Sequence, residues 1–193
     1  MSILKIARMG HPVLARPAGP VDDPTAPEVR ALVRDMLETL VDVGGLGLAA
    51  PQVHAPLRLV IFHLPLARAE AAGETESVDL TVLVNPVVEP LTDETASDWE
   101  GCLSVPGLRG LVPRYRSVRY SGLGLDGERI EREATGLHAR IVQHECDHLD
   151  GILYPMRMTD LGKLVFESEL ERFLSESKRD ERVGGSGDEN GAA

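Results

Sequence analysis

Two histidines four residues apart, in the run His-Glu-Cys-Asp-His, have the spacing of metal ligands. On a helix, positions i and i+4 lie on the same face, so His144 and His148 can bind one ion together. Glu145 then lies beside the ion, where a carboxylate can act as a general base. A catalytic metal needs three protein ligands and one open position, and Cys102 is the natural third ligand. The other cysteine, Cys146, projects from a different face of that helix.

The pentad alone is also typical of zinc proteases. The chain continues with Gly151, so it matches the pattern His-Glu-x-x-His-x-x-Gly-x-x-His as far as the glycine. The pattern fails at its last position, which holds Tyr154. A glutamate ligand from a following helix, Glu167 or Glu169, is the alternative, although both fit the solvated face of that helix better.

Composition indicates one globular domain that can bury a substantial core. The chain has 193 residues, 42% of them hydrophobic and 26% charged. It has no apolar run of 18 residues and does not start like a secretory signal, so we expect no membrane contact and a bacterial-type cytosol or an organelle interior. Two cysteines, one assigned to metal, agree with a reducing compartment. The net charge of −11 argues against direct nucleic-acid readout.

Hydrophobic periodicity predicts the elements that must position these residues. Apolar residues recur at helical spacing over 26–43, and Gly44 and Gly45 end this helix. The helix with the two histidines is predicted from about 135 to about 151, and a last helix over 160–178. Strands are predicted where Val, Ile and Leu gather beside proline, or across an Asp-Gly turn. The four segments are 57–66, 80–88, 117–125 and 128–133.

These elements predict an α+β fold. We expect a single domain in which mixed or antiparallel strands pack around a central metal-binding helix, with one N-terminal and one C-terminal helix. The catalytic domain should span 1–174. Residues 175–193 should form a disordered tail, because the segment from 182 onward has almost nothing to bury.

Three separated segments resemble, in the same order, the three motifs of peptide deformylases. They are 45–52 (GLGLAAPQ), 100–104 (EGCLS) and 143–151 (QHECDHLDG). The likeness extends from residue 6 to about 158. It implies that the chain removes the N-formyl group from the initiator methionine of nascent polypeptides and releases formate. A metal-dependent peptidase or amidase and a non-catalytic deformylase-like binding protein are the alternatives.

The resemblance also implies a role for each motif. Cys102 and the two histidines would hold a divalent ion, Fe(II) in the active form, although the same ligands suit Zn, Ni and Co. Glu145 would take a proton from water and pass it to the departing amine. The side-chain amide of Gln52 and the backbone N–H of Leu103 would stabilise the developing oxyanion. The residues expected to bind substrate are Gly45, Leu46, Gly47, Arg109, Leu137 and Ile141.

Expectations also follow for several further residues. Arg140 departs from an all-apolar pocket wall, and we expect its guanidinium to reach solvent or a substrate carbonyl. Gln143 and Asp147 could orient ligands, but for the acid a solvated position on the helix is at least as plausible. Trp99 fits a wall or lid, and His54 could line the cleft. Transient ribosome contact through Lys178, Arg179 and Arg182 is also expected from the family.

Overall fold

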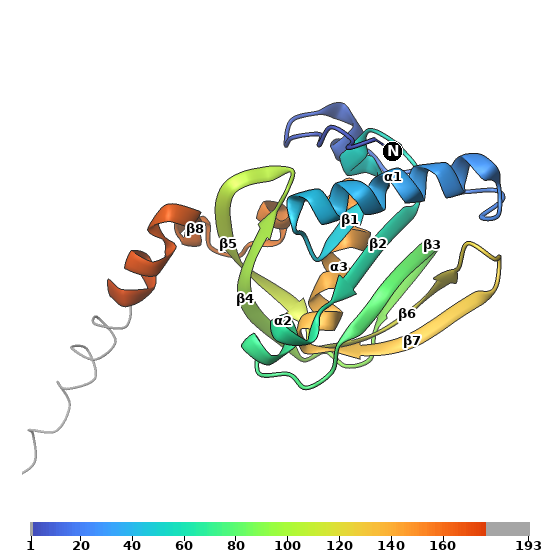
Figure 1. Ribbon diagram of the computed structural model, residues 1–193. Coiled ribbons are helices and arrows are strands. Elements are labelled where there is room, and N and C mark those ends of the chain that lie inside the picture. The colour runs from blue at the N-terminus through green and yellow to red at the C-terminus, as the bar shows by residue number, and fades with distance from the viewer. Residues whose placement is uncertain (1, 177–193) are drawn as a thin grey trace, which may run out of the picture.

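The computed structural model describes residues 2–176, which form two antiparallel sheets with helix α3 packed against the larger one (Figure 1). The labelled α-helices are α1 (Pro27–Val43), α2 (Leu66–Ala71) and α3 (Gly136–Leu149), and a further helix begins at residue 170. The larger sheet has the order β1-β2-β3-β6-β7, with β1 (Gly47–Ala49), β2 (Leu59–Leu64), β3 (Val78–Pro90), β6 (Ser117–Leu123) and β7 (Arg129–Thr135). The smaller sheet has the order β4-β5-β8, with β4 (Thr95–Cys102), β5 (Val105–Tyr115) and β8 (Leu164–Phe166).

Short 3₁₀ helices connect these elements. They are η1 (Pro12–Ala15), η2 (Ala50–Val53), η3 (Tyr154–Arg157), η4 (Leu161–Lys163) and η5 (Glu167–Glu169).

The α+β class and the central helix are confirmed. The predicted helix over 26–43 begins at Pro27 and ends where Gly44 adopts a left-handed conformation, with its N–H bonded to the carbonyls of Leu40 and Val41.

Strand β2 explains why a run of apolar residues marks this part of the sequence. Leu59 and Ile61 belong to the hydrophobic cluster beneath α1, whereas Val60 and Phe62 belong to the cluster beneath α3. Successive strand residues point to opposite faces, so both faces of the sheet are buried at β2. The larger sheet therefore holds α3 firmly on one side, while α1 covers the other.

The predicted hairpin across Asp126-Gly127 is confirmed as β6 and β7. Strands β4 and β5 were not predicted from the sequence. Strand β4 is mostly exposed and polar, and β5 contains Pro106 and Pro113, which are uncommon inside strands. Their pairing with each other, which runs from Thr95–Tyr115 to Cys102–Val105, stabilises them instead.

The predicted C-terminal helix over 160–178 is wrong in its first ten residues. Residues 164–166 form β8, which pairs with β5 from Leu108 to Gly110, and the helix begins only at residue 170. The free edge of β5 offers unpaired backbone groups, and a Leu-Val-Phe segment satisfies them well. Helical spacing of apolar residues was therefore misleading here.

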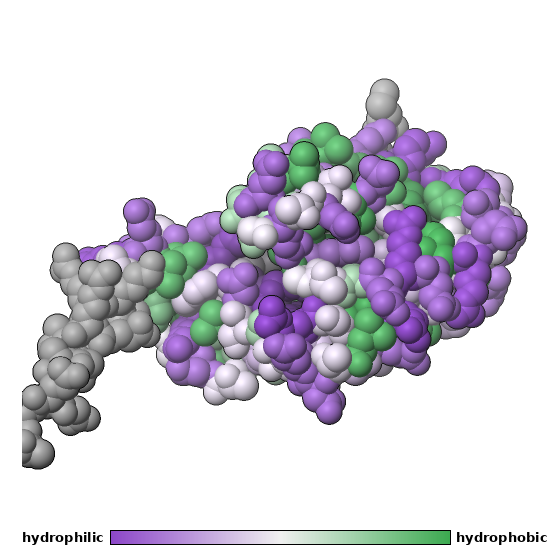
Figure 2. Space-filling view, turned by 90° about the horizontal axis from the view of Figure 1, so that it is seen from below, coloured by the Kyte–Doolittle hydropathy of each residue, from purple (hydrophilic) through white to green (hydrophobic). Residues whose placement is uncertain are grey.

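Most of the face shown in Figure 2 is hydrophilic, with hydrophobic side chains in small, separated groups. None of the helices within residues 2–176 has the length and apolarity needed to cross a bilayer. The boundary at residue 174 stays a prediction. The predicted disordered tail and the basic residues Lys178, Arg179 and Arg182 lie beyond the described residues, apart from 175 and 176, which are helical.

His138, near the start of α3, generates a prediction about the pH dependence of stability. Burial, with a contribution from Arg132, lowers the pKa of His138 to about 4, and its Nε2 lies 3.2 Å from the Tyr120 hydroxyl. The folded state therefore resists protonation that the unfolded chain accepts below about pH 6.5, so stability should fall as the pH drops from 6.5 toward 4.

When the pH drops from 7 to 5, the neutral His138 should lower the free energy of unfolding of the metal-free protein by about 1 kcal/mol. This value is reduced because the side chain is partly exposed. Urea unfolding of wild type and His138→Gln at both pH values measures it. The variant should lose about 1 kcal/mol less than wild type. Equal losses in the two proteins would contradict the assignment.

Candidate metal centre

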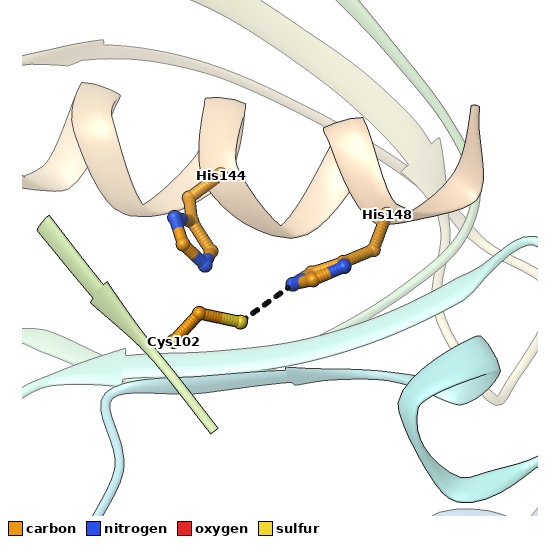
Figure 3. Close-up of side chains that lie close together, drawn as sticks. All are labelled: Cys102, His144 and His148. Carbon is orange, nitrogen blue, oxygen red and sulfur yellow. Dashed lines mark hydrogen bonds between the residues drawn. The ribbon is translucent and has the colours of Figure 1, made fainter. Parts of the chain in front are cut away.

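Three potential metal ligands from two distant segments converge. Cys102 ends β4, while His144 and His148 lie one turn apart on α3. One ligand atom from each residue lies within 4.8 Å of the other two, and Cys102 Sγ is 3.2 Å from His148 Nε2. Figure 3 shows the three side chains pointing toward one another. The geometry thus brings together the ligands that the sequence predicted.

The chemistry of this donor set fits a divalent transition metal. A thiolate with two imidazoles suits iron, zinc, cobalt and nickel. Burial keeps the pKa of His148 well below its usual value, so this ring is neutral, as a metal ligand must be. Within the range 2–176, no other group of three His, Cys, Asp or Glu side chains comes close enough to share an ion.

Glu100, two residues before Cys102, orients one of the histidines. His144 Nδ1 lies 2.8 Å from Glu100 Oε2, and this contact leaves Nε2 of the ring for an ion. Burial alone would raise the pKa of Glu100, but hydrogen bonds with His144 and Arg114 outweigh it and lower the pKa. Glu100 belongs to the second motif, 100–104, and no role was predicted for it. Its position two residues from a ligand on a strand was the available signal.

Asp147 is buried and paired, so a solvated position is wrong for it. Its carboxylate accepts hydrogen bonds from Arg114 Nη1 at 2.5 Å and from Arg157 Nη2 at 2.7 Å. Arg114 also donates to both oxygens of Glu100. A chain of buried charges therefore runs from the back of α3 to the metal ligands. Gln143 is no part of it, because its side chain bonds the backbone of Tyr115.

The expected direction of the Arg140 guanidinium is also wrong. The side chain does line the cleft, but only 8% of the residue is exposed. Its guanidinium donates to Glu100 Oε1, to the Val112 carbonyl and to the Ala96 carbonyl instead of reaching solvent. The helix spacing correctly placed Arg140 on the site face, but it could not reveal acceptors that come from β4 and β5.

Glu145 is buried beside the ligands. Burial raises its pKa to about 7, and its Oε2 has no hydrogen-bond partner among the described residues. The approach of Gly47 encloses it, because a Cβ at Gly47 would lie 2.6 Å from the Glu145 carboxyl carbon. An unpaired buried oxygen costs about 1–3 kcal/mol, which a water or ligand in the cleft can recover. Glu145 Oε2 can therefore accept a hydrogen bond from a water or a substrate group that enters the cleft.

Gln52 has a fixed orientation. Its Oε1 accepts from the Ala49 N–H at 2.9 Å, so its Nε2 must face the other way, toward Cys102 Sγ at 3.4 Å and Ser104 Oγ at 3.2 Å. Leu103 lies in the tight connection between β4 and β5 and lines the same cleft. Both predicted oxyanion residues are therefore next to the metal ligands.

The cleft has a volume of about 490 Å³ and contains every predicted substrate-binding residue. Gly45, Leu46 and Gly47 form one wall. Leu137 and Ile141 of α3 form another. His63 of β2 fixes the first wall, because its ring bonds the Gly45 carbonyl and its backbone N–H donates to the Leu46 carbonyl.

The segment after β8 completes the rim. Glu167 lines the cleft and pairs with Arg109. It is exposed, as predicted, but it belongs to η5 and not to the predicted C-terminal helix. Arg109 in turn packs over Gly101, where a Cβ would lie 2.5 Å from its Nη1. Trp99 lines the cleft and packs edge-on against Phe173, with ring centroids 5.8 Å apart. His54 is exposed and is not one of the residues that line the cleft, so the expectation that it could do so is wrong.

Comparisons with known proteins agree with this geometry. The model of the polypeptide deformylase family matches residues 3–164. Peptide deformylase 1 of Bordetella pertussis is 56% identical over 165 residues, which are 86% of this chain and 93% of that protein. Peptide deformylase 1 of Nitrosomonas europaea is 51% identical over 168 residues, 87% of this chain and 94% of the relative.

Solved structures show the same likeness. A crystal structure of class I type b peptide deformylase from Acinetobacter baumannii with Met-Ala-Ser bound superposes with a TM-score of 0.75 and 37% sequence identity. It covers 82% of this chain and all of that chain. The chain therefore belongs to the peptide deformylase family, enzymes that remove the N-formyl group from nascent polypeptides.

Proposed function

We propose that this chain deformylates N-formylmethionyl nascent peptides at the centre formed by Cys102, His144 and His148. The observation that carries the proposal is the convergence of these ligands with the buried carboxylate of Glu145 in one cleft. Met-Ala-Ser, bound in the Acinetobacter baumannii relative, is the peptide that remains when formyl-Met-Ala-Ser has lost its formyl group. We place the reaction in a bacterial-type cytosol, where transient contact with the ribosome would bring the enzyme close to nascent peptides.

Cys102, His144 and His148 would hold a divalent ion, which would supply one part of the chemistry by lowering the pKa of water toward neutrality. We assign Fe(II) to the active form, with Zn, Ni and Co as other occupants. His144 keeps its ring orientation through Glu100, and this fixes the lone pair that it offers.

Glu145 moves the proton in this scheme. A pKa of about 7 lets the carboxylate take a proton from the attacking water and release it to the departing amine near neutral pH. Two donors stabilise the oxyanion: the amide Nε2 of Gln52 and the backbone N–H of Leu103. The Gln52 amide is held in place because its Oε1 accepts a hydrogen bond from the Ala49 N–H. Donors fixed in this way typically contribute about 2.7–4 kcal/mol each in the transition state.

Substrate binding falls to the cleft walls. Gly45, Leu46 and Gly47 pair with the peptide backbone, because glycine lets another main chain approach closely. Leu137 and Ile141 contact the methionine side chain. Arg109 donates to a carbonyl further along the peptide, in exchange for part of its contact with Glu167.

Glu145→Gln should retain the metal and lose formate release from formyl-Met-Ala-Ser by about 10²–10⁴-fold, because the amide cannot accept the water proton. Elemental analysis and a formate assay on the same preparation measure both effects. A variant that keeps wild-type turnover with full metal content would show that another group transfers the proton.

Cys102→Ala should lose metal affinity by at least about 10–100-fold, since a direct ligand contributes no less than an outer partner. Cys146→Ala is the matched control, because its thiol is buried on α3 and burial raises its pKa, so it packs without binding metal. Metal content is measured after dialysis against a competing chelator. Equal retention by both variants would remove Cys102 from the ligand set.

The Fe(II) form, reconstituted without oxygen, should turn over faster than the Zn(II) form and lose this advantage in air, because the iron and the Cys102 thiolate both oxidise. The two forms are compared by formate release before and after exposure to air. An Fe(II) form that is no faster than the Zn(II) form would contradict the assignment of iron.

A further inference from the structure

Arg140 is a buried arginine in the wall of the cleft, one turn before His144 on α3. Its Nη1 donates to Glu100 Oε1 at 2.7 Å and to the Val112 carbonyl at 2.9 Å. Its Nη2 donates to the Ala96 carbonyl at 2.7 Å. One guanidinium thus ties α3 to both strands of the β4–β5 hairpin, and a planar group with five donors is suited to this task.

This tie joins the two parts of the metal centre. The hairpin carries Cys102 at the end of β4, and α3 carries both histidines. The ligand atoms can share an ion only if the hairpin and the helix keep a fixed separation. Arg140 helps to set that separation, since Ala96 and Val112 lie on the two paired strands of the hairpin.

Arg140 also fixes the carboxylate that orients His144. Glu100 Oε1 lies within hydrogen-bond distance of Arg114 Nε and Arg140 Nη1, while Oε2 lies within that distance of Arg114 Nη2 and His144 Nδ1. Two contacts at each oxygen use the accepting directions of a carboxylate fully. Without Arg140, Oε1 would keep one contact and the carboxylate could turn away from the histidine.

Arg140 also contributes to the charge around Glu100. Arg114 and Arg140 are buried cations that both bond the Glu100 carboxylate, and Arg114 bonds the buried carboxylate of Asp147 as well. Removing Arg140 takes one buried positive charge away from Glu100, and the remaining partners must shift to compensate.

We propose that Arg140 is a positioning residue of the metal centre, which holds the Cys102 hairpin and the Glu100 carboxylate in place and thereby slows metal release. The inference rests on the proposed ligand set. An apolar residue at this helix position would serve the pocket wall equally well but would make none of these bonds.

The test measures metal release from zinc-loaded protein after mixing with excess chromogenic chelator. Arg140→Met keeps a long side chain and removes the guanidinium. We expect release to be about 10-fold faster than in wild type, at the low end of the loss in metal affinity seen when a direct partner of a ligand is removed, because Arg140 acts through Glu100. In the cobalt-substituted protein, the thiolate-to-cobalt absorption band should also shift, because the ligand geometry has changed.

Arg58→Met is the matched control. Arg58 also bonds a carboxylate, Asp150, together with the carbonyls of Leu149 and Pro86, and so ties the end of α3 to β3 without touching Glu100. Its zinc release and cobalt spectrum should stay near wild type. If Arg140→Met releases zinc at the wild-type rate, or if Arg58→Met accelerates release equally, the proposal is wrong.

Arg140→Lys covers the case in which Arg140→Met does not fold. Lysine keeps the charge but cannot bond the carboxylate and both carbonyls in the same plane. We expect faster release than in wild type, and a wild-type rate would overturn the proposal. If the wild-type protein failed to bind one metal ion per chain, the proposed function itself would be refuted.

Discussion

The buried carboxylate of Glu100 is the interaction on which the rest of the site depends. An isolated carboxylate in a protein interior would take up a proton, because burial disfavours the charged form. Here Arg114, Arg140 and His144 hold it charged. A charged Glu100 in turn fixes the imidazole that points toward Cys102. The ligand geometry therefore follows from electrostatics that no single element supplies.

The same network fastens the metal helix on two sides. Asp147 lies three residues after His144 and binds Arg114 as well as Arg157 of η3, so α3 is tied both to the hairpin and to the segment that follows it. Buried ion pairs add little net stability, since desolvation offsets their attraction. Their effect here is geometric, because each pair fixes one element against another around the ligands.

Glycine makes the remaining contacts possible. Gly47 lets β1 approach until it encloses Glu145, and this enclosure raises the pKa of the carboxylate to about 7. Gly101 likewise makes room for Arg109 next to Cys102. Because these two glycines have no side chain, Glu145 can be enclosed by β1 and the Arg109 guanidinium can lie close to the strand that carries Cys102.

The sequence by itself determined the elements whose signal is local. Helical periodicity and the spacing of His144 and His148 predicted α3, and runs of Val, Ile and Leu predicted β2 and β3. The need for a third metal ligand pointed to Cys102, and motif resemblance identified Gln52. Only the tertiary structure decided β4, β5 and β8, because their stability comes from pairing with distant segments. It also decided the partners of Arg140 and Asp147. Whether a charged side chain is solvated or buried depends on acceptors that other elements bring to it, and no local pattern records them.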